Sequence, residues 1–453
     1  MSSDTDDFLR EFRAHFPDAG VPKLCRAPGR VNLLGEHIDY NGLPVLPMTI
    51  DREIRIAFAP RTDSTIRLHE IDTAYPQAEF VNEPAIPASP RGAWENYCKA
   101  AVHGLNAHLQ PASFPGMDLL VEGTIPMAAG LSSSTALVVA SALAYLNVLG
   151  VPLDKSGISR IELAGLLADA ERYVGTQGGG MDQAIILLGG EGAACKINFH
   201  PLRVEQAPLV PGHAIVVCNS LVKADKSGGA LHRYNEGPLS CRLIRAMVER
   251  KAQEEFGPEI EFDRLDDLWS GPLCLTNAEV ETLFAQTFHR ETTSLAEAAR
   301  FLELSVDEIR AKWLGDLPEP EGGFRLQARA RHQIAEFKRV ELGRDCLLAG
   351  DAPGFGALMN ASHESCRVDY RVSCDELDQL VAAARASGSL GSRLTGAGFG
   401  GCTVNLVPAS HTSEFRRQIE KRYYEPLARH RGITANLDAA VLVVQPSLAA
   451  GYS

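Results

Sequence analysis

The sequence predicts an α+β fold arranged in two domains. Its 453 residues exceed the size of about 250–300 residues at which a single hydrophobic core usually stops growing. Short runs with strand-like alternation or β-branched content are interleaved with longer apolar or amphipathic helical patterns. Strands are expected at residues 53–60, 65–70, 117–123, 193–199, 214–220, 401–407 and 439–444. Helices are expected at residues 5–16, 136–150, about 158–174, about 375–388 and about 412–428.

The boundary between the two domains is expected near residues 205–212, where QAPLVPGH places two prolines and a glycine between two strand patterns. We therefore assign residues 1–210 to an N-terminal domain and residues 211–453 to a C-terminal domain. Within the second domain, residues of about 240–330 are expected to form an inserted helical subdomain. Two capping-box patterns predict helix starts there, at Ser294–Glu297 and Ser305–Glu308.

Charge and composition exclude several classes of function. The formal net charge of −13 argues against nucleic acid or an anionic membrane as a main partner. No apolar run approaches the roughly 18 residues of a membrane span, and no signal peptide is expected, which predicts a cytoplasmic protein. The ten cysteines form no C-x-x-C pair and the histidines lack metal-ligand spacing, so we expect reduced thiols and no structural metal. We expect a monomer.

The segment CRAPGRVNLLGEHIDYN (residues 25–41) combines a buried-strand pattern with a cluster of polar groups. Glu36, His37 and Asp39 follow directly after the apolar run and can exchange hydrogen bonds with several hydroxyl groups of one small polyol. Arg30 adds a positively charged fork with fixed geometry. The alternative is a salt-bridged loop, because structural ion-pair networks also concentrate charged residues.

Two further segments are suited to bring the backbone close to a ligand. TIPMAAGLSSST (residues 124–135) places small residues and serines at the start of an apolar helix, where free N–H groups and the helix dipole favour phosphate. No Walker-type sequence occurs in the chain. Glycines 178–180 are unsuited to the interior of a helix or strand, and they place Asp182 where it can face a cleft. For the serines and for Asp182 alike, a simple helix N-cap is the alternative.

A third glycine-rich segment, LTGAGFGGCTVNLV (residues 394–407), contains the spacing of a dinucleotide-binding fingerprint at Gly396, Gly398 and Gly401. That fingerprint requires a strand before it and a helix after it. The residues that follow, CTVNLV, have the composition of a strand instead. The segment therefore does not predict a dinucleotide site.

Together these segments resemble the motifs of the GHMP small-molecule kinase superfamily. GRVNLLGEHIDYNGLPVLPM is similar to its galactokinase signature, and IPMAAGLSSSTA and LTGAGFGGCTV are similar to its two other motifs, in the family's order. The resemblance implies a ribosomal S5 domain 2-like N-terminal domain and a ferredoxin-like C-terminal α+β sandwich with a helical insertion. It also implies ATP and Mg²⁺ as cofactors, and phosphorylation of the C1 hydroxyl of galactose to give galactose 1-phosphate and ADP.

The resemblance assigns roles to individual residues. It makes Asp182 and Arg30 catalytic, with Asp182 against the anomeric hydroxyl and Arg30 beside it. Contacts to the sugar are implied for Arg30, Glu36, His37, Asp39, Gly179, Asp182 and Tyr234. Contacts to ATP are implied for Trp94, Gly130, Leu131, Ser132, Ser133 and Ser134. The implied ligands of Mg²⁺ are Ser134 and Glu171. The spacing of Trp94 and Tyr97 fits a core position for the tryptophan equally well.

Three alternatives stay open at this point. The middle insertion resembles the branch that includes N-acetylgalactosamine kinases, so N-acetylgalactosamine is the alternative substrate, although Tyr234 favours galactose. A non-catalytic sensor of galactose and ATP is the second alternative. A kinase acting on mevalonate or homoserine is not favoured, because such an enzyme would not explain the segment GEHIDYN. Asp182 either removes the proton of the hydroxyl or mainly orients it, because a loose transition state needs little activation of the nucleophile.

Overall fold

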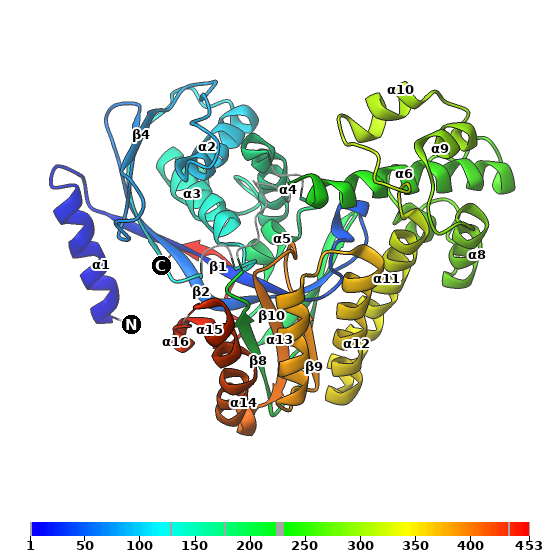
Figure 1. Ribbon diagram of the computed structural model, residues 1–453. Helices are drawn as coiled ribbons and strands as arrows, with labels where there is room; N and C mark the ends of the chain where they lie inside the picture. Colours follow the sequence, from blue (N-terminus) through cyan, green and yellow to red (C-terminus); the bar gives the residue numbers. More distant parts are fainter. Residues whose placement is uncertain (1, 127–128, 176–177, 223–230, 434, 453) are drawn as a thin grey trace.

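The chain forms two main β-sheets with helices on their faces, and a lobe of helices extends to one side (Figure 1). This arrangement confirms the expected α+β class. The computed structural model describes residues 2–126, 129–175, 178–222, 231–433 and 435–452, with the backbone alone at residues 2–4 and 231–234.

The larger sheet positions the signature segment. Its strands, in hydrogen-bonded order, are β12 (Gly451–Tyr452), β1 (Lys23–Leu34), β2 (Leu46–Pro60), β5 (Met117–Gly123), β3 (Thr65–Glu70) and β4 (Ala78–Val81). β1 and β2 form a long antiparallel pair in which Arg30 lies opposite Thr49. Because β12 pairs with β1, the end of the chain returns to this first sheet.

Helices cover both faces of the larger sheet. On one side lie α2 (Glu95–Leu109), α3 (Ser133–Leu149), α4 (Arg160–Ala170) and α5 (Met181–Leu188) (Figure 1). α3 is apolar around nearly its whole circumference because it packs against β1, β2, α2 and α5. Along β2, Ile56 and Phe58 point into that core, whereas Ala57 and Ala59 pack with Phe12 of α1 (Ser2–His15). This alternation is the two-residue period of a strand that is covered on both faces.

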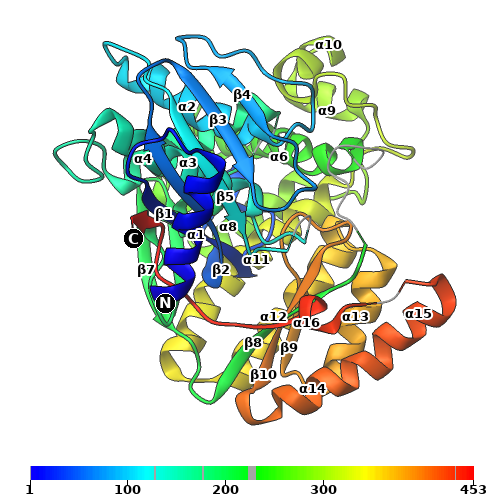
Figure 2. The same cartoon turned by 90° about the vertical axis from the view of Figure 1, so that its left-hand side faces the viewer.

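The second sheet is antiparallel and has the order β11 (Val441–Val444), β8 (His213–Asn219), β10 (Cys402–Pro408) and β9 (Gly391–Leu394). In β8, Ile215 and Val217 belong to the main core, while Val216 and Cys218 pack with the C-terminal helices. The helices beside this sheet (Figure 2) are α12 (Ala352–Ser365), α13 (Asp375–Ala386), α14 (Thr412–Ile419), α15 (Glu425–Arg431) and α16 (Leu437–Ala440). A hairpin of β6 (Ala193–Phe199) and β7 (Leu202–Pro208) precedes the sheet.

The helical lobe has a hydrophobic core of its own. It contains α6 (Leu231–Phe256), α7 (Asp267–Ser270), α8 (Asn277–Thr287), α9 (Leu295–Leu302) and α10 (Val306–Ile309). Both expected capping boxes are confirmed, at the starts of α9 and α10. α11 (Leu326–Ala349) leaves the lobe and packs against β1, β2 and α12, so it joins the lobe to the larger sheet.

Most of the elements expected from the sequence are present, and the differences have physical reasons. The strands at 65–70, 117–123 and 193–199 have the expected bounds. α3 starts at Ser133, three residues before the apolar run, because the serines form its first turn. The helix expected at 412–428 contains a π-helical turn at Glu420–Tyr424. Four of the described strands were not expected, namely β4, β7, β9 and β12.

All ten cysteines lie in the described part of the chain and are free thiols, as expected. Among the described residues, none of the helices combines the length and apolar character that a bilayer-spanning segment requires.

Candidate active site

The signature segment leaves β1 through a tight turn. Gly35 has a φ of +87°, and a Cβ atom there would lie 2.8 Å from Cγ2 of Val340 on α11. His37 has a φ of +59°, which is uncommon for a residue other than glycine. A short helical turn, Asp39–Asn41, follows. The left-handed residues thus let the chain reverse direction next to α11.

Arg30 and Asp182 form a bidentate ion pair although they are 152 positions apart. Nε of Arg30 donates to Oδ1 of Asp182 at 2.7 Å, and Nη2 donates to Oδ2 at 2.8 Å. Nη1 of Arg30 donates to the carbonyl oxygen of Gly130 at 2.6 Å. Burial opposes the charged guanidinium most strongly. The negative charges of Asp182, Glu36 and Asp39, with the hydrogen bonds to Asp182, together outweigh burial and raise the pKa of Arg30. Two parallel hydrogen bonds fix the orientation of both side chains.

The serine loop contacts the same ion pair. Ser132 adopts a φ of +61° directly before α3, and its hydroxyl donates to Oδ2 of Asp182. The backbone N–H of Arg30 donates to the carbonyl oxygen of Leu131 at 3.2 Å. Since α3 begins at Ser133, the N–H groups of its first turn lack partners within the helix and lie at this loop. The arrangement is suited to an anion such as phosphate.

The third glycine-rich segment packs on the serine loop. A Cβ atom at Gly396 would lie 2.7 Å from the carbonyl oxygen of Gly130, and one at Gly401 would lie 3.0 Å from that of Ala129. Only glycine permits so close an approach of two backbones. Strand β10 follows at Cys402, which confirms that the segment lacks the helix of a dinucleotide-binding fingerprint. The segment forms one wall of the serine loop instead.

Asp39 lies against the glycines that precede α5. The N–H of Gly179 donates to Oδ2 of Asp39 at 3.2 Å, and a Cβ atom at Gly179 would lie 2.4 Å from the Asp39 backbone. Burial, with smaller contributions from the negative charges of Asp182 and Glu36, raises the pKa of Asp39 to about 7. The fold therefore brings Asp182 close to Glu36 and Asp39, two carboxylates that the sequence placed in another segment.

Glu36 forms a buried ion pair that the sequence did not predict. Its Oε2 accepts hydrogen bonds from Nη2 of Arg393 at 2.9 Å and from the N–H of Gly396 at 3.1 Å. Arg393 is fully buried in β9, and its Nη1 donates to the carbonyl oxygen of Asn32 at 2.9 Å. One oxygen of Glu36 is therefore committed to the protein. An arginine within the short segment GSRL is a weak signal for such a pair.

The ring of His37 contacts two residues from the second half of the chain, Tyr370 and Ala397. It stacks on Tyr370 with 5.0 Å between ring centroids and 20° between the planes. Its Nε2 lies 3.2 Å from the carbonyl oxygen of Ala397, so this nitrogen carries the proton and donates. Tyr370 and Ala397 were missed by sequence reasoning, because neither stands in a pattern that indicates a partner near residue 37.

Ser134 and Glu171 lie around one tyrosine, Tyr97. Burial and the negative charge of Glu171 raise the pKa of Tyr97, and a hydrogen bond involving the Ser134 side chain partly opposes this. A hydroxyl and a carboxylate are hard oxygen ligands of the kind that Mg²⁺ accepts, with water and phosphate oxygens completing its shell. The two residues therefore fit a Mg²⁺ ion bound together with a nucleotide. In the described ranges, no set of three or more His, Cys, Asp or Glu side chains is placed to hold a metal ion.

Trp94 is buried in the main core, where its Nε1 donates to the carbonyl oxygen of Pro76 at 2.9 Å. The rings of Trp94 and Tyr75 meet in a T-shaped arrangement, with 5.8 Å between their centroids. This placement favours the core position that the sequence left as an alternative. Tyr234 stands in the first turn of α6, and its side chain lies outside what the structure describes.

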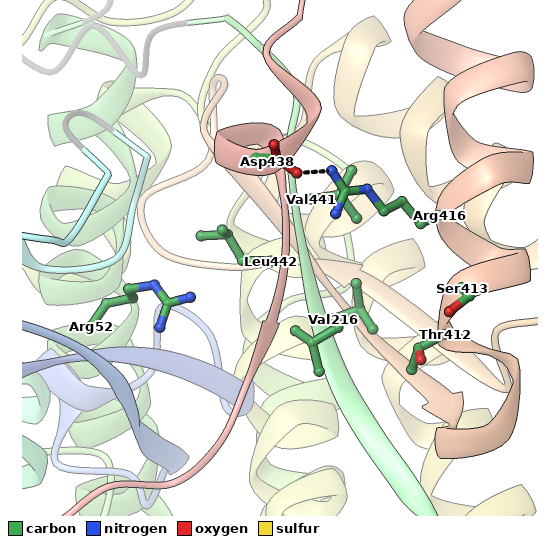
Figure 3. Close-up of a pocket in the computed structure, with 9 residues that line it drawn as sticks. Arg52, Val216, Thr412, Ser413, Arg416, Asp438, Val441 and Leu442 are labelled. Atoms are coloured by element: carbon green, nitrogen blue, oxygen red, sulfur yellow. Dashed lines mark hydrogen bonds and ion pairs between the residues drawn. The ribbon is translucent and has the colours of Figure 1, made fainter.

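Two cavities can be compared with these positions. One, of about 430 Å³, is lined by Asp39 and Gly179 together with Tyr40, Arg242 and Arg264, so it opens beside the predicted sugar residues. Another, of about 310 Å³, lies between β8, β11 and α14, where Arg416 pairs with Asp438 (Figure 3). Among the described residues that line the second cavity, none belongs to the predicted site.

Comparison with known proteins identifies the family. The model of the galactokinase galactose-binding signature matches residues 10–60, and those of the GHMP kinase N-terminal and C-terminal domains match residues 96–190 and 344–425. A galactokinase of Dictyostelium discoideum is 34% identical over 88% of this chain and 83% of its own length. A galactokinase of Roseiflexus sp. is 35% identical over 94% and 93%. The chain belongs to the galactokinase family.

The solved structures agree with this assignment to the galactokinase family. The crystal structure of Lactococcus lactis galactokinase complexed with galactose matches with a TM-score of 0.76 and 26% identity, over 99% of both chains. The family resemblance and the GHMP kinase architecture expected from the sequence are therefore confirmed.

Proposed function

We propose that this galactokinase-family enzyme transfers the γ-phosphoryl group of ATP to the anomeric C1 hydroxyl of galactose, giving galactose 1-phosphate and ADP. The observation that carries the proposal is the bidentate pair of Arg30 and Asp182 beside the serine loop. The similarity to curated galactokinases, and to the Lactococcus lactis enzyme complexed with galactose, supports galactose as the sugar.

Asp182 accepts a hydrogen bond from the C1 hydroxyl and then takes its proton as the oxygen–phosphorus bond forms. Arg30 and Ser132 donate three hydrogen bonds to this carboxylate, and these stabilise its ionised form. Such stabilisation favours orienting the hydroxyl over removing the proton early, as a loose transition state permits. Arg30 also places a positive charge where negative charge is shared over the phosphoryl oxygens.

The nucleotide is assigned to the start of α3. The backbone of Gly130 and Leu131 and the hydroxyls of the serine loop face phosphate oxygens, with Ser133 at the first helical position. Ser134 and Glu171 hold Mg²⁺, which neutralises phosphate charge when it is bound. The family resemblance assigns an adenine contact to Trp94, which lies in the main core.

Replacing Glu171 by glutamine is expected to raise the Mg²⁺ concentration needed for half-maximal activity more than it raises the KM for galactose. The reason is the loss of one hard anionic ligand from the metal. Rates measured across a Mg²⁺ titration at saturating ATP check this. Glu162→Gln, on the exposed first turn of α4, is the matched control. A change confined to the galactose KM would remove Glu171 from the metal site.

The sugar is assigned to Glu36, His37, Asp39, Gly179 and Tyr234, together with the Arg30–Asp182 pair. Because the pKa of Asp39 is raised to about 7, its carboxylate becomes protonated as the pH falls through that value. Protonation removes the negative acceptor for sugar hydroxyls, so kcat/KM for galactose should fall between about pH 8 and pH 6. Asp39→Asn should lower kcat/KM and abolish this slope. A slope that persists unchanged in the asparagine variant would show that another group titrates.

Release of ADP in the presence of ATP, Mg²⁺ and a sugar panel tests the proposal. The panel contains galactose, N-acetylgalactosamine, glucose, arabinose and mevalonate. We expect the highest kcat/KM for galactose and strong rejection of glucose, because the C4 epimer leaves buried polar partners unpaired. A roughly tenfold advantage for N-acetylgalactosamine would make that sugar the substrate. Binding of galactose and ATP without ADP release would indicate a sensor.

The domain boundary and the oligomeric state that the sequence predicts form part of the same proposal. It comprises the division into residues 1–210 and 211–453 and a monomeric state. Limited proteolysis tests the first, and light scattering of the purified protein tests the second.

A further inference from the structure

One face of α11 holds the turn that carries the predicted sugar residues. His332, Gln333 and Glu336 lie on this face, all three are fully buried, and each contacts the backbone of residues 35–37. His332 and Glu336 (i, i+4) and Gln333 and Glu336 (i, i+3) are neighbours on the helix surface, which is why one short stretch can reach the whole turn. The two segments are separated by about three hundred positions in the sequence.

Glu336 accepts hydrogen bonds from the backbone N–H groups at the start of the turn. Its Oε2 accepts from the N–H of Gly35 at 3.0 Å and from the N–H of Glu36 at 3.3 Å. The same oxygen accepts from the hydroxyl of Ser362 at 2.8 Å, and Arg339 pairs with Oε1 at 2.5 Å. The buried carboxylate of Glu336 therefore holds both backbone N–H groups in place. Without it, these two donors would lack hydrogen-bond partners in the core.

Gln333 and His332 hold the remainder of the turn. Nε2 of Gln333 donates to the carbonyl oxygen of His37 at 3.0 Å, and its Oε1 accepts from Nδ2 of Asn41 at 2.7 Å. Nε2 of His332 lies 2.9 Å from the carbonyl oxygen of Glu36, and its Nδ1 lies 2.9 Å from the hydroxyl of Ser365. Because a carbonyl can only accept, Nε2 carries the proton and Nδ1 accepts from Ser365.

These contacts are important because the backbone of the turn adopts a conformation that is unfavourable in free energy. His37 keeps its left-handed conformation only if its surroundings determine it, and sites of this kind commonly serve function. Asp39 lies two residues beyond His37, within the same turn. A small shift of this backbone therefore moves the sugar acceptors relative to Arg30 and Asp182.

We propose that His332, Gln333 and Glu336 are positioning residues for the sugar: they set the affinity for galactose by fixing residues 35–41, and they leave the nucleotide site unaffected. The inference rests on the proposed function, since it takes residues 36–39 as sugar contacts. It differs from a purely structural role in one respect. A structural role changes the stability of the fold and all kinetic constants together, whereas a positioning role separates the KM for galactose from the KM for ATP.

Gln333→Ala tests this directly, with Gln327→Ala as the matched control. Gln327 lies on the same helix and donates to the carbonyl oxygen of Phe288 at 2.8 Å, away from the turn. Loss of both Gln333 contacts should raise the KM for galactose about tenfold, with the KM for ATP and kcat within about threefold of the parent. Gln327→Ala should leave both KM values within about twofold. Thermal melting and calorimetric galactose binding are measured for each variant.

A second pair of variants keeps the inference open to contradiction if Gln333→Ala does not fold. Glu336→Ala removes the acceptor of two N–H groups, whereas Glu336→Gln retains an acceptor oxygen in the same place. The alanine variant should raise the dissociation constant of galactose about tenfold or more, and glutamine should restore most of the affinity.

Equal effects on galactose and ATP, or an unchanged galactose KM in a folded Gln333→Ala variant, would contradict the positioning role. A parent enzyme that binds no galactose would instead contradict the proposed function. The two failures are therefore distinguishable.

Discussion

Asparagine in place of Asp182 should lower kcat by about a hundredfold or more while galactose and ATP still bind, which is the usual range for loss of a positioned acid–base group. The amide keeps the shape of the side chain, and its oxygen can still accept from Arg30. It lacks the negative charge that takes up the proton of the C1 hydroxyl. Steady-state rates give kcat, and calorimetry gives the dissociation constants of the two substrates.

Asp118→Asn is the matched control for this experiment. Asp118 is buried in β5 and, like Asp182, accepts hydrogen bonds from an arginine, with Nε of Arg67 at 2.6 Å. Its replacement should lower thermal stability and leave kcat close to that of the parent. If Asp182→Asn turned over galactose at a near-normal rate, Asp182 would have no part in the mechanism.

Methionine in place of Arg393 should lower the free energy of unfolding by about 3–5 kcal/mol, because it leaves the buried charge of Glu36 without its partner. Arg393 is fully buried and links β9 to the signature turn through Glu36 and the carbonyl oxygen of Asn32. Urea denaturation followed by circular dichroism measures the change.

The double variant Glu36→Gln with Arg393→Met separates the two contributions to this effect. Removing the charge on Glu36 as well should recover part of the lost stability, since no uncompensated ion then remains in the core. Unfolding of Arg393→Met at the same urea concentration as the parent would show that the pair does not stabilise the fold.

The elements that could be predicted from the sequence are those with an undisturbed local period. β3 alternates between buried and partly exposed residues, and the run from 136 to 149 is apolar on nearly all sides, so a strand and a helix were expected there. β9 was missed because its four residues include a charged side chain that a buried strand rarely carries. The partner that makes Arg393 acceptable, Glu36, is 357 positions away.

The same limit applies to the candidate site. Glu36, Asp39 and Asp182 stand in recognisable segments, so a common site for them could be predicted from the family motifs. Their contacts could not, because pairing between segments far apart in the chain depends on the tertiary fold. Examples are the hydrogen bond from Ser132 to Asp182 and the hydrogen bond from the Gly35 N–H to Glu336 on α11. No local period relates residues 35–37 to residues 332–336.

The identity of the product is the most direct test of the central claim, which is phosphoryl transfer to the anomeric hydroxyl of galactose. The enzyme is incubated with galactose, ATP and Mg²⁺, and phosphorus NMR follows the reaction. We expect a phosphomonoester whose phosphorus couples to the C1 proton, formed in a one-to-one ratio with ADP and nearly absent with Asp182→Asn over the same period. A phosphoester at another carbon, or inorganic phosphate released from ATP without any sugar ester, would contradict the claim.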